Sequence, residues 1–149
     1  MAKIKRSILI KVPIEKAFSY MSNPLNQMEW LPGLFSVRNV TGMGVGQRFI
    51  WNYKMMGIPL KGEAICTECT PSERIVFDTT GSINSTWTFA LKPQNDRTLM
   101  DFTVEYTIPV PGLGKLGEKL ILWQNEREAD LAMKNIKEWL GYRAQFKTY

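Results

Sequence analysis

The sequence contains no histidine in its 149 residues. This absence excludes three kinds of site together: Ser-His or Cys-His nucleophilic machinery, imidazole general bases and histidine metal ligands. Carboxylates and phenols are the groups left for any proton transfer. We expect no metal site and no cofactor.

Cysteine is also scarce, because the chain has only Cys66 and Cys69. Two cysteines cannot form a disulfide framework, which agrees with a reducing compartment. The segment Cys66-Thr-Glu-Cys69 has the cysteine spacing of a redox or zinc motif. A zinc site here would lack its second pair of ligands. The segment falls in a predicted strand, where residues three apart point to opposite faces. The spacing therefore predicts two unrelated thiols.

Long apolar runs are missing as well. No run reaches the roughly 18 residues of a membrane helix, and the N-terminus lacks the apolar length and cleavage site of a signal peptide. We therefore expect a cytoplasmic protein. The net charge of +5 would suit nucleic acid only if the basic residues were clustered. The basic residues near the C-terminus lie among acidic ones: Lys134, Lys137 and Arg143 beside Glu126, Glu128, Asp130 and Glu138. This mixture predicts a solvated surface and no specific nucleic-acid partner.

One segment, residues 115–140, has helical periodicity over its length and contains no proline. Apolar residues at spacings of three, four and seven share one face, with Asn125 on the same line: Leu122, Ala129, Ala132, Met133, Ile136 and Leu140. Two of these residues, Ala129 and Ala132, are small. The helix therefore either packs closely on a sheet or leaves open volume beside the alanines.

Most of the remaining chain alternates between apolar and polar residues. Two short helices are expected after the first strand, one from Ile14 to Met21 and one ending at Met28. The predicted strands are 3–12, 34–41, 47–54, 58–70, 74–80, 83–92 and 97–107. Short connections make the strands antiparallel. We predict one α+β domain, residues 1–149, in which a curved antiparallel sheet of about seven strands wraps around the long C-terminal helix.

The inner face of this sheet is rich in aromatic residues. So many large side chains opposite a helix with alanines favour a ligand cavity over a solid core. The residues expected to line it are Phe49, Trp51, Tyr53, Ser85, Trp87, Phe89, Tyr106, Asn125, Ala129 and Met133. The weak catalytic candidates are Tyr53, Tyr106 and, if it turns inward, Glu68. An exposed Glu68 is the alternative.

The start of the long helix is apolar almost all round. Leu116, Leu120 and Trp123 lie nearly opposite the core stripe and follow a segment rich in proline and glycine. Three explanations stay open: a mobile lid over the cavity, a patch for a transient membrane, protein or dimer contact, or packing against the neighbouring loop. Both a monomer and a homodimer agree with the sequence.

Several short sequence segments give the chain a resemblance to a known superfamily. They are SILI at 7–10, VPIEKAF at 12–18, Asn23-Pro24, Trp30-Leu31-Pro32-Gly33, Gly44-Val45-Gly46 before Phe49, Trp87-Thr88-Phe89 before Thr98, and 130–137. Together they resemble the START-like (SRPBCC, Bet v 1-like) superfamily of polyketide cyclases, dehydrases and lipid-transport proteins. The resemblance covers nearly the whole chain, and it implies a helix-grip fold with an internal cavity. None of these segments is a catalytic motif.

Three functions fit this resemblance. The favoured one is binding or transport of a hydrophobic or aromatic small molecule, such as a lipid or polyketide, in the cavity. The second is an enzyme of the cyclase/aromatase kind that uses the same cavity without histidine chemistry. The third is a co-chaperone-like interaction module, which would use the outer surface and have a well-packed interior. Fold does not choose among them.

Overall fold

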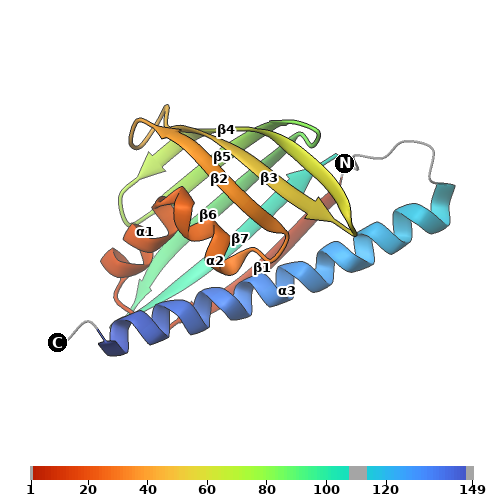
Figure 1. Ribbon diagram of the computed structural model, residues 1–149. Helices are drawn as coiled ribbons and strands as arrows, with labels where there is room; N and C mark the ends of the chain where they lie inside the picture. Colours follow the sequence, from red (N-terminus) through yellow and green to blue (C-terminus); the bar gives the residue numbers. More distant parts are fainter. Residues whose placement is uncertain (1, 108–113, 147–149) are drawn as a thin grey trace.

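The computed structural model describes residues 2–107 and 114–146, with side chains through residue 141. Seven strands and three α-helices follow one another in the predicted order (Figure 1). The elements are β1 (Ala2–Ile10), α1 (Ile14–Ser22), the 3-10 turn η1 (Pro24–Asn26), α2 (Gln27–Trp30), β2 (Leu34–Thr41), β3 (Arg48–Met55), β4 (Ile58–Thr70), β5 (Arg74–Gly81), β6 (Ser85–Gln94), β7 (Arg97–Tyr106) and α3 (Gly114–Phe146).

All seven strands form one antiparallel sheet, in the order β1-β7-β6-β5-β4-β3-β2. The turn between β3 and β4 consists of Met56 and Gly57, whose φ angles are 51° and 81°. Two residues with positive φ make a turn that matches the twist of the strands it joins. The sheet confirms the predicted helix-grip α+β fold, with β1 and β2 as its two edges.

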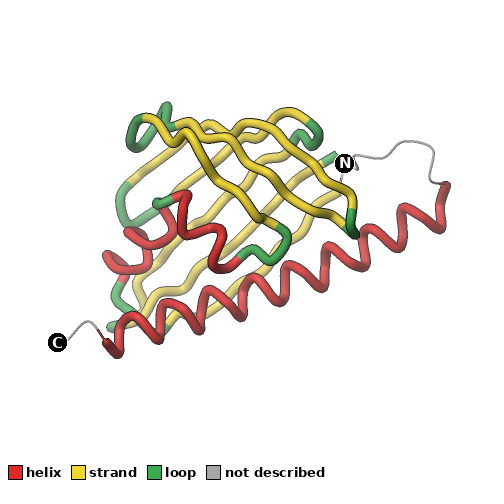
Figure 2. Tube along the Cα trace, viewed as in Figure 1, coloured by secondary structure: helices red, strands yellow, loops and turns green. Residues whose placement is uncertain are grey.

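The long helix α3 runs across the concave side of the curved sheet, and α1 and α2 close one end (Figures 1 and 2). At the β1 edge, Arg6 binds Glu126 at 2.5 Å and Asp130 at 2.6 Å. Near the closed end, the Asn135 side chain donates a hydrogen bond to the Trp30 carbonyl at 3.2 Å. Within the described ranges, no helix is long and apolar enough to cross a bilayer.

The predicted faces of the strands agree with the observed burial. In β7 the apolar residues at every second position are all buried, as alternation requires: Met100, Phe102, Val104 and Tyr106. The aromatic rings make a continuous inner layer, because Phe102 stacks on Phe89 with ring centres 5.3 Å apart. Phe89 also meets Trp30 edge to face at 5.9 Å. Trp30 thereby fixes α2 to the sheet at the closed end.

One helix position was predicted wrongly. Leu122 was expected in the buried stripe but is 36% exposed, while Ile121 is buried at 5%. Ile121, Asn125, Ala129 and Met133 are each four residues apart, so the buried line continues back to Ile121. One further residue turns the side chain by about 100°, and Leu122 therefore points to the edge of the interface.

The expected arrangement of the two cysteines is also wrong. A β-bulge shifts the register of β4 between Cys66 and Glu68, so Cys66 pairs with Phe77 and Cys69 with Ile75. Both partners are buried on the inner side, and both thiols belong to it too. An extra residue in one strand changes the alternation of faces. Burial, with Cys69 close by, raises the pKa of the Cys66 thiol to about 11.

Candidate ligand-binding cavity

A cavity lies between the inner face of the sheet and α3. Its volume is about 110 Å³, measured as the space that the centre of a water molecule can reach. One water needs roughly 10–15 Å³ on this measure. The space is therefore large enough for a small organic molecule, and most of its wall is apolar.

Nine of the ten residues predicted to bind a ligand line this cavity. They are Phe49, Trp51 and Tyr53 on β3, Ser85, Trp87 and Phe89 on β6, Tyr106 on β7, and Asn125 and Ala129 on α3. Met133, the tenth, lies one helical turn beyond Ala129 and is buried in the core, outside the cavity wall. Alternation along the strands and the four-residue repeat on the helix bring the nine together. Their role in binding stays a prediction.

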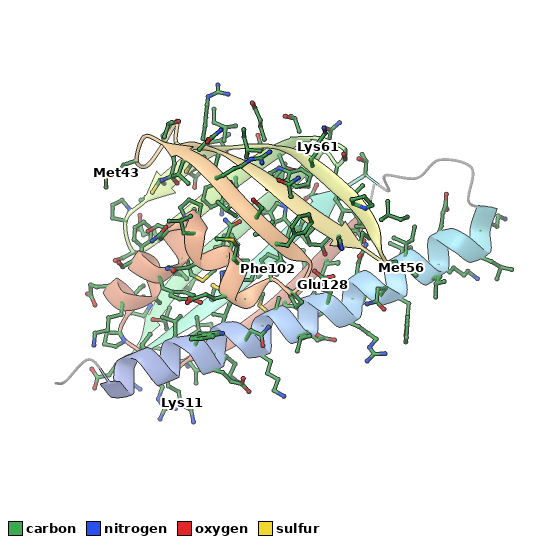
Figure 3. The ribbon with its side chains drawn as sticks, viewed as in Figure 1. Lys11, Met43, Met56, Lys61, Phe102 and Glu128 are labelled. Carbon is green, nitrogen blue, oxygen red and sulfur yellow. The ribbon has the colours of Figure 1, made fainter. Side chains whose placement is uncertain are left out.

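Glu128 is the lining residue that the sequence reasoning missed. It was counted among the solvated charges, yet it is part-buried on the cavity wall and lies between α3 and the sheet (Figure 3). The available signal was its spacing, because Asn125, Glu128 and Ala132 are three and four residues apart and share one face. A carboxylate on an otherwise apolar face of a helix indicates a candidate site residue.

Two donors hold one oxygen of the Glu128 carboxyl. The Tyr53 hydroxyl donates a hydrogen bond to Oε1, and the Gly33 backbone N–H donates to the same atom at 3.3 Å. Gly33 can come this close because it lacks a side chain: a Cβ atom there would lie 2.7 Å from the Tyr53 ring and from the Lys54 carbonyl oxygen. The loop before β2, the strand β3 and the helix α3 meet at this carboxyl.

Burial changes the proton affinity of these groups. Loss of hydration raises the pKa of Glu128, while the hydrogen bonds from Tyr53 and Gly33 oppose the shift. Burial also raises the pKa of Tyr53, and the adjacent Glu128 adds to the effect. Tyr53 is therefore a neutral donor at physiological pH, and Glu128 holds its proton to a higher pH than an exposed glutamate.

A second polar pair lies on the same side of the cavity. The Asn125 side-chain amide donates to the Tyr106 hydroxyl oxygen at 2.8 Å, and both residues are buried. Because the Tyr106 oxygen is the acceptor in this pair, its own proton is left to donate to another group. Burial raises the pKa of Tyr106, so that proton is retained.

Three polar side chains on the sheet, those of Trp87, Ser85 and Thr79, are satisfied among themselves. Trp87 Nε1 donates to Ser85 Oγ at 2.8 Å, Ser85 Oγ bonds Thr79 Oγ1, and Thr79 Oγ1 donates to the Ile83 carbonyl at 3.4 Å. The Thr79 proton goes to Ile83, so the proton between the two hydroxyls comes from Ser85. This Trp87-to-Ile83 chain leaves no hydroxyl proton for a ligand.

Glu68, the third catalytic candidate, lies away from the cavity. Its carboxylate binds Arg74 Nε at 2.7 Å on the outer side of the sheet, as the exposed alternative expected. Within the described residues, no group of three or more His, Cys, Asp or Glu side chains could hold a metal ion. Glu128 therefore replaces Glu68 as the acid or base that a cavity ligand would meet.

The predicted lid residues are exposed. Leu116 is 84% exposed, and Leu120 and Trp123 are about half exposed, with Arg127 lying over the Trp123 ring at 5.0 Å. None of the three lines the cavity. In Figure 1 the first turns of α3 extend beyond the sheet. The segment at 108–113 lies outside the described residues, and the lid stays a prediction.

The sequence matches the family described as polyketide cyclase / dehydrase and lipid transport over residues 1–140. No curated protein matches the sequence. One similar solved structure is TTHA0849 from Thermus thermophilus, with a TM-score of 0.81 and 19% identity over 93% of this chain and 97% of that chain. A second is the Zhui aromatase/cyclase from a Streptomyces species, with a TM-score of 0.77 and 12% identity over 96% of this chain and 95% of that chain. A third is a START superfamily protein from Mycobacterium smegmatis, with a TM-score of 0.74 and 12% identity over 94% of this chain and 97% of that chain. Identities this low establish the shared fold alone.

Proposed function

The chain belongs to the polyketide cyclase / dehydrase and lipid transport family, and on that basis we propose that its cavity binds a hydrophobic or aromatic small molecule of lipid or polyketide type. The observation that carries this proposal is the apolar cavity between the sheet and α3. Aromatic side chains provide large apolar contact area, and a few polar groups fix the orientation of a ligand. Here those polar groups are Tyr106, Asn125 and Glu128.

The proposal is tested by searching for the ligand directly. Native mass spectrometry of protein purified from its source cells should show a bound species that denaturation releases. Titration with the neutral fluorescent probe N-phenylnaphthylamine should show saturable binding that the released species displaces. Absence of both a bound species and saturable probe binding would refute the binding function.

A second candidate is an enzyme of the cyclase/aromatase kind, and one observation favours it. Glu128 and Asn125 lie within one turn of α3, so a carboxyl group and the Tyr106 hydroxyl reach the same part of the cavity. In such a step, Glu128 takes a proton from the carbon next to a ligand carbonyl. The electron pair of the broken C–H bond moves to the carbonyl oxygen, which accepts a hydrogen bond from Tyr106.

This second candidate predicts proton exchange without a cofactor. Tetralone, an aromatic ketone, incubated with the protein in heavy water should exchange its protons next to the carbonyl faster than with the Glu128→Gln variant. The exchange is followed by proton NMR. Equal exchange rates with the wild-type protein, with the variant and in buffer would refute the enzyme and leave the binding function unaffected.

The co-chaperone-like alternative is not supported by the interior of the protein. It was expected to have a well-packed core, whereas the described residues line a cavity.

A further inference from the structure

One acidic side chain lines the described part of the cavity wall. Among the described residues that line it, Glu128 is the only one with an ionisable carboxyl group, and none is a lysine or arginine. The neighbouring cations are engaged elsewhere. Arg6 binds Glu126 and Asp130 at the β1 edge, and the Lys54 ammonium lies 5.8 Å from the centre of the Phe35 ring. The described residues therefore provide no counter-charge for Glu128 inside the cavity.

The Glu128 carboxyl has one oxygen left for a ligand. Both protein donors, the Tyr53 hydroxyl and the Gly33 N–H, bind Oε1. In the described part of the chain, Oε2 has no hydrogen-bond partner. The two bonds to Oε1 also fix the direction of the carboxyl group, because one links it to β3 and the other to the loop before β2. Oε2 is thus a positioned acceptor.

The walls around this acceptor favour a cation over an anion. Indole and phenol rings attract a positive charge through their faces, and Trp51, Trp87 and Tyr53 all line the cavity. A ligand cation would also relieve the cost of ionising Glu128 in an apolar space. A ligand carboxylate would instead meet a like charge at low dielectric, which disfavours binding.

We propose that the ligand is a hydrophobic amine, whose protonated nitrogen donates to Glu128 Oε2 while its apolar body lies among the aromatic side chains. This inference rests on the proposed binding function and narrows it to one charge class. It also excludes fatty acids and other anionic amphiphiles as preferred ligands.

The test compares three probes that share the naphthalene ring and differ in charge. Naphthylethylamine is cationic at neutral pH, ethylnaphthalene is neutral and naphthylpropionate is anionic. Isothermal titration calorimetry should give the order amine, neutral, carboxylate, with the amine about tenfold tighter than the neutral probe, as expected for a hydrogen bond to a charged group. Equal affinities for amine and neutral probe, or tighter binding of the carboxylate, would overturn the proposal.

Variants locate the effect at Glu128. Glu128→Gln should abolish the preference for the amine over the neutral probe. Glu138→Gln, at an exposed position of the same helix, removes the same charge and should keep the preference. If Glu128→Gln retains the preference, the proposal is wrong even though the cavity binds ligands. If no probe of any charge binds the wild-type protein, the binding function itself fails.

Discussion

The Tyr53 hydroxyl donates a hydrogen bond to Glu128 and thereby connects β3 to the middle of α3. On the opposite side, Arg6 connects β1 to the same part of the helix through Glu126 and Asp130. β1 is an edge strand, and β3 lies next to the other edge. The helix is therefore held at both sides of the curved sheet, and the cavity lies between the two attachments.

The first prediction concerns the pH dependence of stability. Because burial raises the pKa of Glu128 in the folded state, its proton is held by both states below about pH 4.5 and by the folded state alone above that, up to the raised pKa. The wild-type free energy of unfolding should fall as pH rises through this window, by at most about 1.4 kcal/mol per pH unit from one group. Glu128→Gln should lose this contribution.

Urea unfolding of both proteins at several pH values provides the measurement. The glutamine variant should gain stability relative to wild type as pH rises. Glu138→Gln is the matched control and should follow the wild-type curve. Parallel curves for Glu128→Gln and wild type would show that this carboxyl is hydrated in the folded protein.

The second prediction concerns Gly33. An alanine Cβ there would lie 2.7 Å from the Tyr53 ring and the Lys54 carbonyl, so Gly33→Ala should cost about 1–3 kcal/mol of stability by overpacking. It should also displace Tyr53 and weaken probe binding. Gly141→Ala is the control, since its Cβ meets nothing within 4 Å, and on a helix it should stabilise by up to about 1 kcal/mol. Equal effects of the two changes on thermal unfolding would contradict this.

The third prediction separates a cavity from a packed interface. Ala129 lines the cavity, so Ala129→Trp should fill it and reduce the affinity for N-phenylnaphthylamine by about tenfold or more, with little change in the free energy of unfolding. In a close-packed interface the same change would cost typically about 1–3 kcal/mol. Leu131→Trp, at an exposed position of α3, should affect neither quantity. Strong destabilisation by Ala129→Trp without any probe binding in wild type would argue against a pocket.

The fourth prediction tests the lid. Leu116, Leu120 and Trp123 are exposed at the start of α3, whereas residues 129–140 pack against the core. Amides in 116–123 should therefore exchange with heavy water faster than those in 129–140, and a bound probe should slow them. Mass spectrometry of peptides from the two halves gives the comparison. A probe that leaves 116–123 unaffected would contradict the lid and leave the other two explanations: a membrane, protein or dimer contact, and packing against the neighbouring loop.

Periodicity predicted most of the fold from the sequence. Strict alternation placed Phe49, Trp51, Phe89 and Phe102 on one face of the sheet, and the structure confirms them as buried. A long helix was the only remaining element able to cover this face, so the layer arrangement followed. These features depend on local repeats, which one sequence displays directly.

The features that the sequence did not reveal depend on contacts between distant segments. Glu128 became a cavity residue because Gly33, 95 positions earlier, leaves room for the Tyr53 ring. The shared face of Cys66 and Cys69 depends on a bulge in β4, which residue types alone did not indicate. Tertiary pairing and register determine such features, and alternation does not report them.

The hydrogen-bond chain from Trp87 to Ile83 has a consequence for how this protein could change its ligand. On the sheet side, Trp87, Ser85 and Thr79 satisfy one another's donors, and the buried Trp51 Nε1 has no partner among the described residues. Apart from that indole, the groups that can discriminate between ligands by polarity are concentrated around Asn125 and Glu128 on α3 and their tyrosine partners. A new specificity would then need few substitutions, at helix positions remote from most of the strand pairing. Scaffold and selectivity could diverge at different rates, and a library restricted to Asn125, Glu128, Ala129 and Ala132 is the economical place to redesign the ligand.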